Sequence, residues 1–158
     1  MRSYLIVLIL SLSFAANAQE TWQQKYLVLE AGGNGGLYSI NYEQIFKFIW
    51  KGDLNFETGI SYSPFFGKHI LSIPISVNYY YGHIHQFAFG VGQVLIIAPL
   101  EDQGGFIRGT FHVGYRYMPE NKKLFYQAGY TPFYSYTSNF QFNHWAGIGI
   151  GYRLKTKK

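Results

Sequence analysis

One alternation of side chains constrains this chain more than any other feature. Between residues 54 and 63, apolar residues take most even positions, and polar residues or glycine take the odd ones. Successive side chains of a β-strand point to opposite faces, so this segment forms a strand with one apolar and one polar face. The pattern recurs about eight times, with aromatic residues near the strand ends. It predicts an all-β fold, an eight-stranded antiparallel up-and-down transmembrane β-barrel with an apolar wall.

The first 18 residues have the features of a secretory signal peptide. Arg2 supplies the positive charge, residues 4–12 form a short apolar run, and Ala16-Asn17-Ala18 is a small-x-small cleavage site. We therefore expect a signal peptide at 1–18 and one barrel domain at 19–158. A helical membrane anchor is the alternative, but the apolar run is shorter than the about 20 residues that a spanning helix needs.

Eight strands can be placed from the alternation and the turn residues between them. The expected ranges are 25–32, 36–46, 53–63, 69–81, 85–96, 106–117, 123–134 and 142–154. The run of Gly and Asn at 32–36 predicts a tight hairpin connection, because these residues accept a positive φ. Pro74 cannot donate to the sheet, so we expect a bulge or a lost hydrogen bond there. An even strand number places both termini on one side, which is periplasmic in barrels of this kind.

Outward-facing residues form the expected membrane wall. Phe56, Ile60, Ile75, Val113 and Ile148 are expected to contact lipid. Two aromatic groups flank the wall: Phe46, Phe48, Trp50, Tyr79, Tyr81, Tyr115, Tyr117 and Tyr152 at the periplasmic ends, and Tyr62, Phe65, Phe66, Tyr130, Phe133, Tyr134 and Phe142 at the other ends. Membrane barrels carry aromatic girdles at both interfaces. A soluble barrel of the lipocalin kind has no reason to place them so, and it turns its apolar face inward.

The same phase directs most strand charges into the lumen. The inward set is Glu30, Glu43, Glu57, Arg108, His112, Arg116 and Arg153. Placing an arginine on the lipid face would cost about 2–4 kcal/mol, which favours this phase. Because an unpaired ion in a narrow lumen is costly, we expect Glu43 and Glu57 to reach at least one of the three arginines. Inner glycines leave room for the arginines and Trp145. The set predicts a structural polar core, with a narrow or gated conductance path as the alternative.

Composition and motifs give no catalytic, metal or cofactor site. The net charge of +5 comes from basic residues spread over turns and the tail, so we expect no nucleic-acid binding. The chain has no cysteine, so its stability depends on the closed hydrogen-bond ladder and on packing. His83 and His85 form one pair without a carboxylate or cysteine nearby in sequence, which is a weak metal signal. His69 and His144 lie near the outer rim, in the region of Ser72, Ser135 and Ser138, but no motif defines a nucleophile and its base.

Taken together, these residues resemble the small outer-membrane barrels of the OmpA transmembrane-domain and OmpX kind. The stretch Gly-Gly-Asn-Gly-Gly-Leu-Tyr-Ser-Ile-Asn-Tyr-Glu and the ending Gly-Ile-Gly-Tyr-Arg-Leu are similar to Bacteroidetes-type outer-membrane barrel proteins. The last strand also resembles the assembly signal of such barrels, with Gly149, Tyr152 and Leu154 suitably spaced. It departs from that signal by ending in leucine and a basic tail at 155–158. The resemblance implies outer-membrane lipid, lipopolysaccharide and the barrel-assembly machinery as partners.

Three functions remain open from the sequence. The leading hypothesis is a non-enzymatic integral outer-membrane protein with a structural or surface-interacting role. The second is a lipid A-modifying enzyme of the deacylase or palmitoyltransferase type. The third is a narrow channel for small solutes.

Overall fold

The computed structural model describes residues 24–47, 52–65, 68–97, 106–120, 122–135 and 141–154. The expected signal peptide and the aromatic residues Phe48, Trp50 and Phe66 lie outside these ranges, as does the side chain of Phe65. Within these ranges, no helix is long and apolar enough to cross a membrane.

Ten strand segments make up the described chain. They are β1 (Gln24–Ala31), β2 (Tyr38–Lys47), β3 (Gly52–Phe65), β4 (Lys68–Gly82), β5 (His85–Ile97), β6 (Phe106–Tyr117), β7 (Leu124–Tyr130), β8 (Phe133–Ser135), β9 (Gln141–Asn143) and β10 (Ala146–Arg153). Their bounds fall within a few residues of the eight expected ranges. The seventh and eighth expected strands are each divided into two segments.

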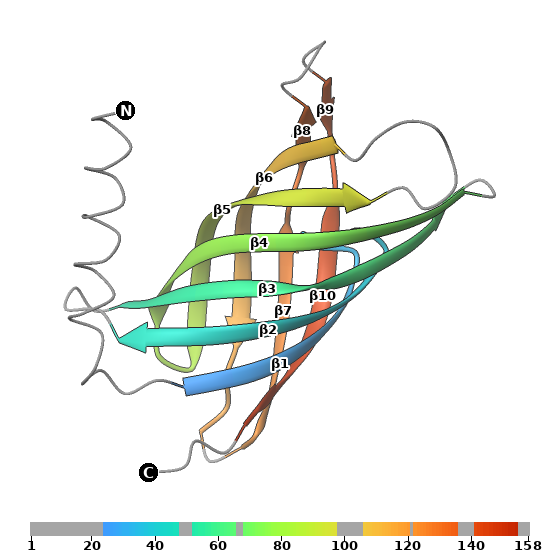
Figure 1. Cartoon of the computed structure of the whole chain (residues 1–158). Helices are drawn as coiled ribbons and strands as arrows, with labels where there is room; N and C mark the ends of the chain where they lie inside the picture. The colour runs from blue at the N-terminus through green and yellow to red at the C-terminus, as the bar shows by residue number, and fades with distance from the viewer. Residues whose placement is uncertain are drawn as a thin grey trace, which may run out of the picture.

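The segments close into a barrel of eight antiparallel strands, as predicted. Neighbours pair in the order β5-β4-β3-β2-β1-β10-β7-β6, and pairing between β5 and β6 completes the ring (Figure 1). β7 and β8 are parts of one strand interrupted at Thr131 and Pro132, and β9 and β10 are parts of another interrupted at His144 and Trp145. The Thr131 amide donates to the Trp145 carbonyl at 2.9 Å, which joins the two strands across both interruptions.

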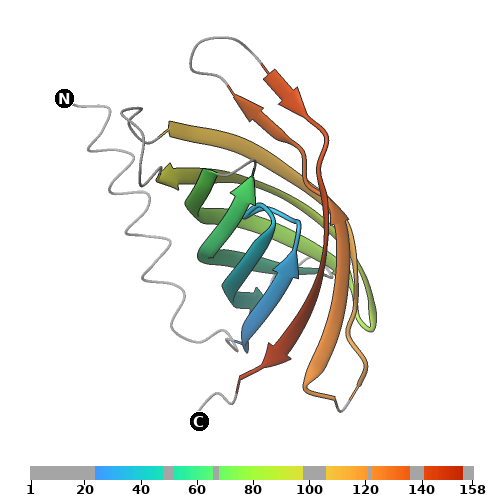
Figure 2. The ribbon, with the colours of Figure 1, turned by 90° about the vertical axis from the view of Figure 1, so that its right-hand side faces the viewer.

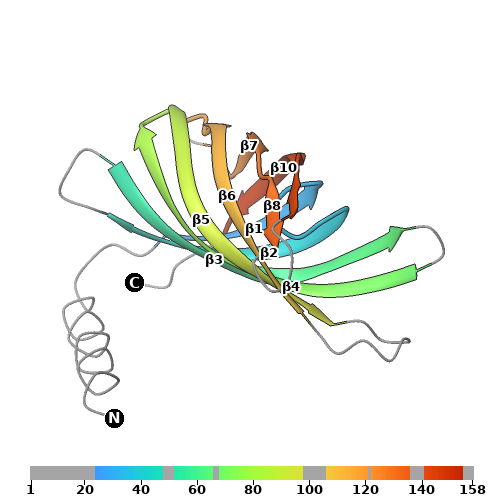
Figure 3. The same ribbon diagram turned by 90° about the horizontal axis from the view of Figure 1, so that it is seen from above.

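The barrel has two different ends, which we call the terminal end and the loop end. At the terminal end the start of β1 meets the end of β10, where Tyr26 pairs with Arg153. The β1–β2, β3–β4, β5–β6 and β8–β9 connections lie at the loop end. β8 and β9 project beyond the other strands there, as Figure 2 shows. Figure 3 shows how strongly β3, β4 and β5 bend as they pass round the barrel.

The wall is apolar outside and polar inside, as the alternation predicted. The five expected wall residues are all exposed: Phe56 41%, Ile60 63%, Ile75 37%, Val113 46% and Ile148 66%. By contrast, Asn41 and Asn78 are fully buried on the inner face. Soluble proteins bury their large apolar residues and expose polar ones. The reversed pattern means that this wall is built to face hydrocarbon.

Pro74 interrupts the β3–β4 ladder without shifting it. Thr58 pairs with Ile75, and the next pair is Ser61 with Ser72, so the positions between them are unpaired but the register is unchanged. The expected loss of hydrogen bonding is therefore observed, and the strand pair has no bulge. Pro74 still lies opposite Val94 of β5, where its ring points into the lumen and is buried.

Aromatic side chains lie on the wall toward both ends. Tyr81, Tyr115, Tyr117 and Tyr152 are exposed near the terminal end, and Tyr62 and Phe142 near the loop end. The outward placement of Phe133 was wrong, because its side chain points inward and is only 9% exposed. Adjacent residues of a strand face opposite ways, so Phe133 and Tyr134 cannot both face outward. Tyr134 takes the outer position, where its ring covers Gly109.

The wall assignment predicts the effect of one charge at mid-strand. Ile75 is the central residue of β4 and faces outward. We expect Ile75→Arg to destabilise the barrel folded in lipid vesicles by about 2–4 kcal/mol, measured by urea unfolding. His83→Arg, in the exposed β4–β5 turn, is the control and should leave stability nearly unchanged. Equal stability of the two variants would contradict the outward phase of β4.

Candidate functional site

The turn between β1 and β2 folds into the lumen. We call residues 32–36 the inward turn; Gly32 and Gly33 take φ values of +79° and +80°, which glycine adopts without strain. Asn34 at its tip is 3% exposed, and its side chain lies 3.5 Å from Ser76 Oγ on β4 and 3.4 Å from Thr110 Oγ1 on β6. The sequence predicted this turn but not its direction.

Hydroxyl groups of the wall hold the inward turn in place. The Gly35 carbonyl accepts hydrogen bonds from Ser61 Oγ at 2.6 Å and Ser72 Oγ at 3.0 Å. Ser63 Oγ accepts from the Leu37 amide at 2.9 Å. Because β3 and β4 supply these groups, the turn is bonded to the wall beside it as well as to β6. A backbone segment therefore occupies the lumen and satisfies its polar groups there.

An ion pair crosses the lumen on the terminal side of the inward turn. Arg116 Nη2 of β6 lies 2.7 Å from Glu43 Oε1 of β2, and both side chains are fully buried. In the closed ring, β2 and β6 are four strands apart in either direction. This contact, which we call the charge bridge, therefore joins opposite walls of the barrel.

The charge bridge continues into a chain of polar contacts. Arg116 Nη2 also lies 2.6 Å from Tyr80 Oη, and the Arg116 Nε donates to Gln127 Oε1 at 3.1 Å. Gln127 Nε2 donates to Glu30 Oε1 at 2.8 Å, and Asn55 Nδ2 donates to Glu43 Oε2 at 2.9 Å. Carboxylates from β1 and β2 are thus linked through the Gln127 amide and the Arg116 guanidinium, and Asn55 adds a further bond to Glu43.

Two carboxylates share a repeated arrangement with the neighbouring strand. Glu30 accepts hydrogen bonds from Asn41 Nδ2 at 2.8 Å and Ser39 Oγ at 3.3 Å. Glu57 accepts from Asn78 Nδ2 at 3.1 Å and Ser76 Oγ at 3.2 Å. In both cases a Ser-x-Asn segment on the next strand binds the glutamate, and the Asn side chain also donates to the Ser hydroxyl. Sequence reasoning noted these polar positions but missed the repeat.

The expected partner of Glu57 is not the one observed. Among the described residues, no guanidinium lies within ion-pair distance of Glu57, whose contacts are the amide and hydroxyl of the Ser-x-Asn segment. Arg108 and Arg116 are eight residues apart on β6, which is about 26 Å along a strand. Arg108 lies toward the loop end, and Arg153 lies at the terminal end beside the ring of Tyr26. Of the three arginines, only Arg116 is at the height of the glutamates.

Inner glycines make room for Asn and His side chains rather than for arginine or Trp145. A Cβ on Gly59 would lie 2.1 Å from Asn41 Oδ1, and one on Gly90 would lie 1.9 Å from Asn78 Oδ1. His112 likewise fills the space beside Gly114 and Gly129. The observed occupants differ because Arg116 reaches across the lumen to Glu43, whereas each of these amides lies against a glycine of the strand next to it.

An apolar layer separates the charge bridge from the terminal end. Tyr26, Val28, Ile45 and Phe125 are buried together, with Met118 packed against them. The rings of Tyr26 and Phe125 meet edge to face at 5.2 Å, and the Arg116 guanidinium lies over the Phe125 ring at 4.4 Å. These residues were missed as a site, although the inward phase of the strand residues among them follows from Glu30 on β1, Glu43 on β2 and Gln127 on β7.

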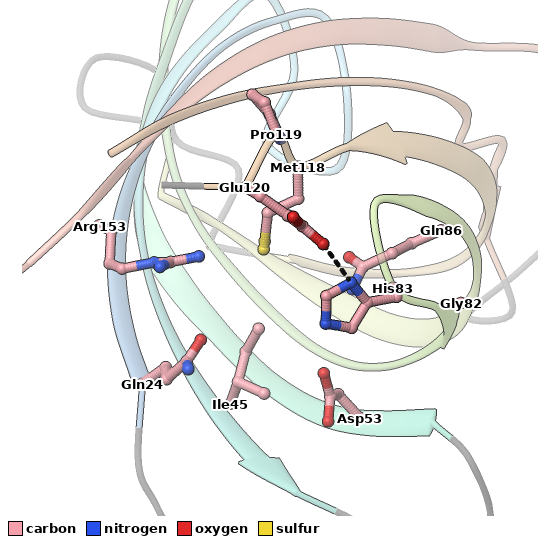
Figure 4. Close-up of a pocket in the computed structure, with 10 residues that line it drawn as sticks. All are labelled: Gln24, Ile45, Asp53, Gly82, His83, Gln86, Met118, Pro119, Glu120 and Arg153. Carbon is pink, nitrogen blue, oxygen red and sulfur yellow. Dashed lines mark ion pairs between the residues drawn. The ribbon is translucent and has the colours of Figure 1, made fainter. Parts of the chain in front are cut away.

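A cavity of about 280 Å³ opens at the terminal end, which we call the terminal pocket (Figure 4). Its lining is Gln24, Ile45, Asp53, Gly82, His83, Gln86, Met118, Pro119, Glu120 and Arg153. His83 Nδ1 points toward Glu120 Oε1 at 3.6 Å, and both side chains are largely exposed. One guanidinium and two carboxylates give this pocket no dominant charge, so it does not select one class of charged ligand.

The remaining histidines contact tyrosines. His69 bonds to Tyr62 Oη and His85 to Tyr115 Oη, and His144 Nδ1 lies 2.6 Å from Tyr130 Oη. Ser72, one of the serines considered above, donates to the inward turn, and Ser138 lies outside the described ranges. Within the part of the chain that the structure describes, no group of three His, Cys, Asp or Glu side chains could hold a metal ion.

Comparisons with known proteins agree with the fold. No family model and no curated protein matches the chain. Among solved structures, the N-terminal β-barrel domain of Pseudomonas aeruginosa OprF superposes with a TM-score of 0.54 at 13% identity, covering 84% of this chain and 96% of that one. Neisserial surface protein A has a TM-score of 0.48 at 12% identity, covering 84% of this chain and 96% of that one. A major outer membrane protein from Thermus thermophilus has a TM-score of 0.47 at 10% identity, covering 84% of this chain and 100% of that one. The fold is that of the small outer-membrane barrels.

The charge bridge predicts a large coupling between two distant residues. Arg116→Met should destabilise the barrel by about 3–5 kcal/mol, because Glu43 would be left buried without its counter-ion. The double variant Arg116→Met/Glu43→Gln should recover part of that loss. Unfolding free energies of the single and double variants in lipid vesicles give the coupling energy.

The exposed pair His83–Glu120 provides a control for that cycle. The same measurement with His83→Gln and Glu120→Gln should give a coupling of no more than about 1 kcal/mol. A coupling at Arg116–Glu43 as small as this one would show that the charge bridge has no structural role.

Proposed function

We propose that this protein is a non-enzymatic outer-membrane barrel with a closed lumen and a structural or surface-interacting role. The observation that carries the proposal is the occupation of the lumen at two heights. The inward turn is bonded to β3, β4 and β6, and the charge bridge joins β2 to β6. An eight-stranded barrel is only wide enough for side chains to fill it, so these two contacts leave little space for solute.

The apolar wall supports a position in the outer membrane. Its exposed aliphatic side chains suit hydrocarbon, and its aromatic side chains near both ends suit the two interfaces. The expected signal peptide and the likeness in fold to the OprF barrel domain are consistent with export to that membrane. Lipid and lipopolysaccharide then surround the wall, and the barrel-assembly machinery inserts it. Both termini are periplasmic in this arrangement, and the loop end is outside.

The histidine contacts favour a non-enzymatic role over lipid modification. A serine nucleophile needs a base within hydrogen-bond reach. At the loop end, His69 and His144 are bonded to tyrosine hydroxyls on the outer wall, where they suit contact with lipid headgroups. Mass spectrometry of lipid A from cells with and without the protein tests this, and any change in acylation that depends on the protein would favour the enzyme.

The closed lumen predicts the absence of steady ion conduction. Purified full-length mature protein inserted into planar bilayers should give no stable current steps, whereas a larger porin inserted in the same bilayers should give them. Insertion is checked separately by co-flotation of the protein with vesicles. Reproducible current steps from the folded barrel would instead support the small-solute channel.

The proposed orientation predicts which connections a protease can reach. A cleavage site inserted into 98–105, the β5–β6 connection, should be cut when protease is added to intact cells. The same site inserted in the β6–β7 turn at residues 118–123 should be cut only after the outer membrane is permeabilised. The reverse result would place the loop end in the periplasm.

A further inference from the structure

A second cavity opens at the loop end, beyond the inward turn. Its volume is about 570 Å³, within the range of small-molecule sites. We call it the loop-end pocket; its lining is Gly35, Gly36, Ser63, Ile70, Ser72, Val94, Ile96, Arg108, Phe133, Gln141, Asn143, His144 and Trp145. Neither the charge bridge nor the apolar layer near the terminal end contributes to it.

One wall of the loop-end pocket is apolar although it faces the lumen, while Gln141, Asn143 and His144 add polar lining beside it. Val94, Ile96 and Phe133 are buried together, with Ile70 and Trp145 packed against them. The rings of Phe133 and Trp145 lie 6.1 Å apart. Elsewhere along β3 and β4 most inward positions hold Ser, Asn or Glu, with Pro74 and Tyr80 among the exceptions, so this surface is more apolar than the middle of the lumen. It favours a ligand with an apolar body.

The floor of the pocket adds little polarity of its own. It is formed by Gly35 and Gly36 of the inward turn, which have no side chains. The hydroxyls of Ser63 and Ser72 beside them are already engaged with the Leu37 amide and the Gly35 carbonyl. A ligand resting on this floor therefore meets a closed, internally bonded surface.

The permanent charge among the described residues that line the pocket is positive. Arg108 is paired with Val94 in the β5–β6 ladder, so it enters the lumen at the height of the apolar wall. Among the described residues that line the pocket, Arg108 carries the one permanent charge, and no carboxylate lines it. A guanidinium has five N–H donors and can bind an oxyanion while keeping other contacts. The terminal pocket, with its two carboxylates, lacks this selectivity.

We propose that the loop-end pocket binds a small amphipathic anion, a compact apolar group that bears one carboxylate. The carboxylate contacts Arg108, and the apolar group packs against Val94, Ile96 and Phe133. The apolar group can be an aromatic ring or a short acyl chain, since the wall offers both aromatic and aliphatic contacts. The protein then acts as a receptor surface for such molecules, with no need for them to pass through the barrel.

The test uses Trp145, which lines the pocket, as a reporter. Trp22 and Trp50 are replaced by phenylalanine, so that Trp145 is the remaining tryptophan of the chain. The full-length mature protein in lipid vesicles is titrated with 4-bromobenzoate and with 6-bromohexanoate, whose bromine quenches tryptophan on contact. At least one should quench with saturation, and the tighter of the two identifies a ring or a chain. The uncharged 4-bromobenzamide should give only the weak, unsaturable quenching of a molecule dissolved in lipid.

Two variants test whether binding depends on the Arg108 charge. Arg108→Gln should raise the dissociation constant by about tenfold or more, the loss expected for one charge-assisted hydrogen bond. Arg153→Gln makes the same change at the terminal end and should leave binding unchanged. If Arg108→Gln does not fold by circular dichroism, Ile70→Glu places a carboxylate in the wall instead and should abolish saturation. Equal quenching by the amide, no saturation with either acid, or equal binding by wild type and Arg108→Gln would overturn the proposal.

Discussion

The charge bridge between Glu43 and Arg116 can form only when the ring of strands closes. Glu43 and Arg116 are 73 residues apart and sit on strands that meet only across the finished lumen. In an open sheet, each would face lipid or water alone, and a lipid-facing arginine costs about 2–4 kcal/mol. Closing the ring buries both charges and pairs them in one step. Further lumen contacts extend from that pair, through Gln127 to Glu30 and from Glu43 to Asn55.

The rest of the lumen is organised by height along the axis. An apolar layer near the terminal end, the charge bridge, the Ser-x-Asn repeat, the inward turn and the loop-end pocket follow one another. Small residues on one strand admit the amides of the next, as Gly59 does for Asn41 and Gly90 for Asn78. Close fit between adjacent strands thus replaces the large hydrophobic core of a soluble domain.

The fold was predictable because lipid outside and polar groups inside impose an alternation that sequence displays directly. The same phase identified Glu30, Glu43 and Arg116 as lumen residues. Which of them meet could not be read from it, because contact across a barrel depends on the stagger between strands far apart in sequence. The inward direction of the turn at 32–36 was hidden for a related reason: Gly and Asn determine a turn's conformation, not the side to which it bends. Phe133 was misplaced because it was grouped with its neighbour Tyr134 as outward, although the outward phase of Tyr126 and Tyr130 continues at Tyr134 and turns Phe133 inward.

The inward turn also decides where this barrel can carry foreign sequence. A peptide inserted between Gly32 and Gly36 would grow into the lumen, against the serines of β3 and β4 that bind the turn. A peptide inserted between β8 and β9 would extend a hairpin that already projects away from the wall (Figure 2). For display of an epitope at the loop end, the β8–β9 connection is therefore the suitable insertion site, and the β1–β2 turn is unsuitable for insertion.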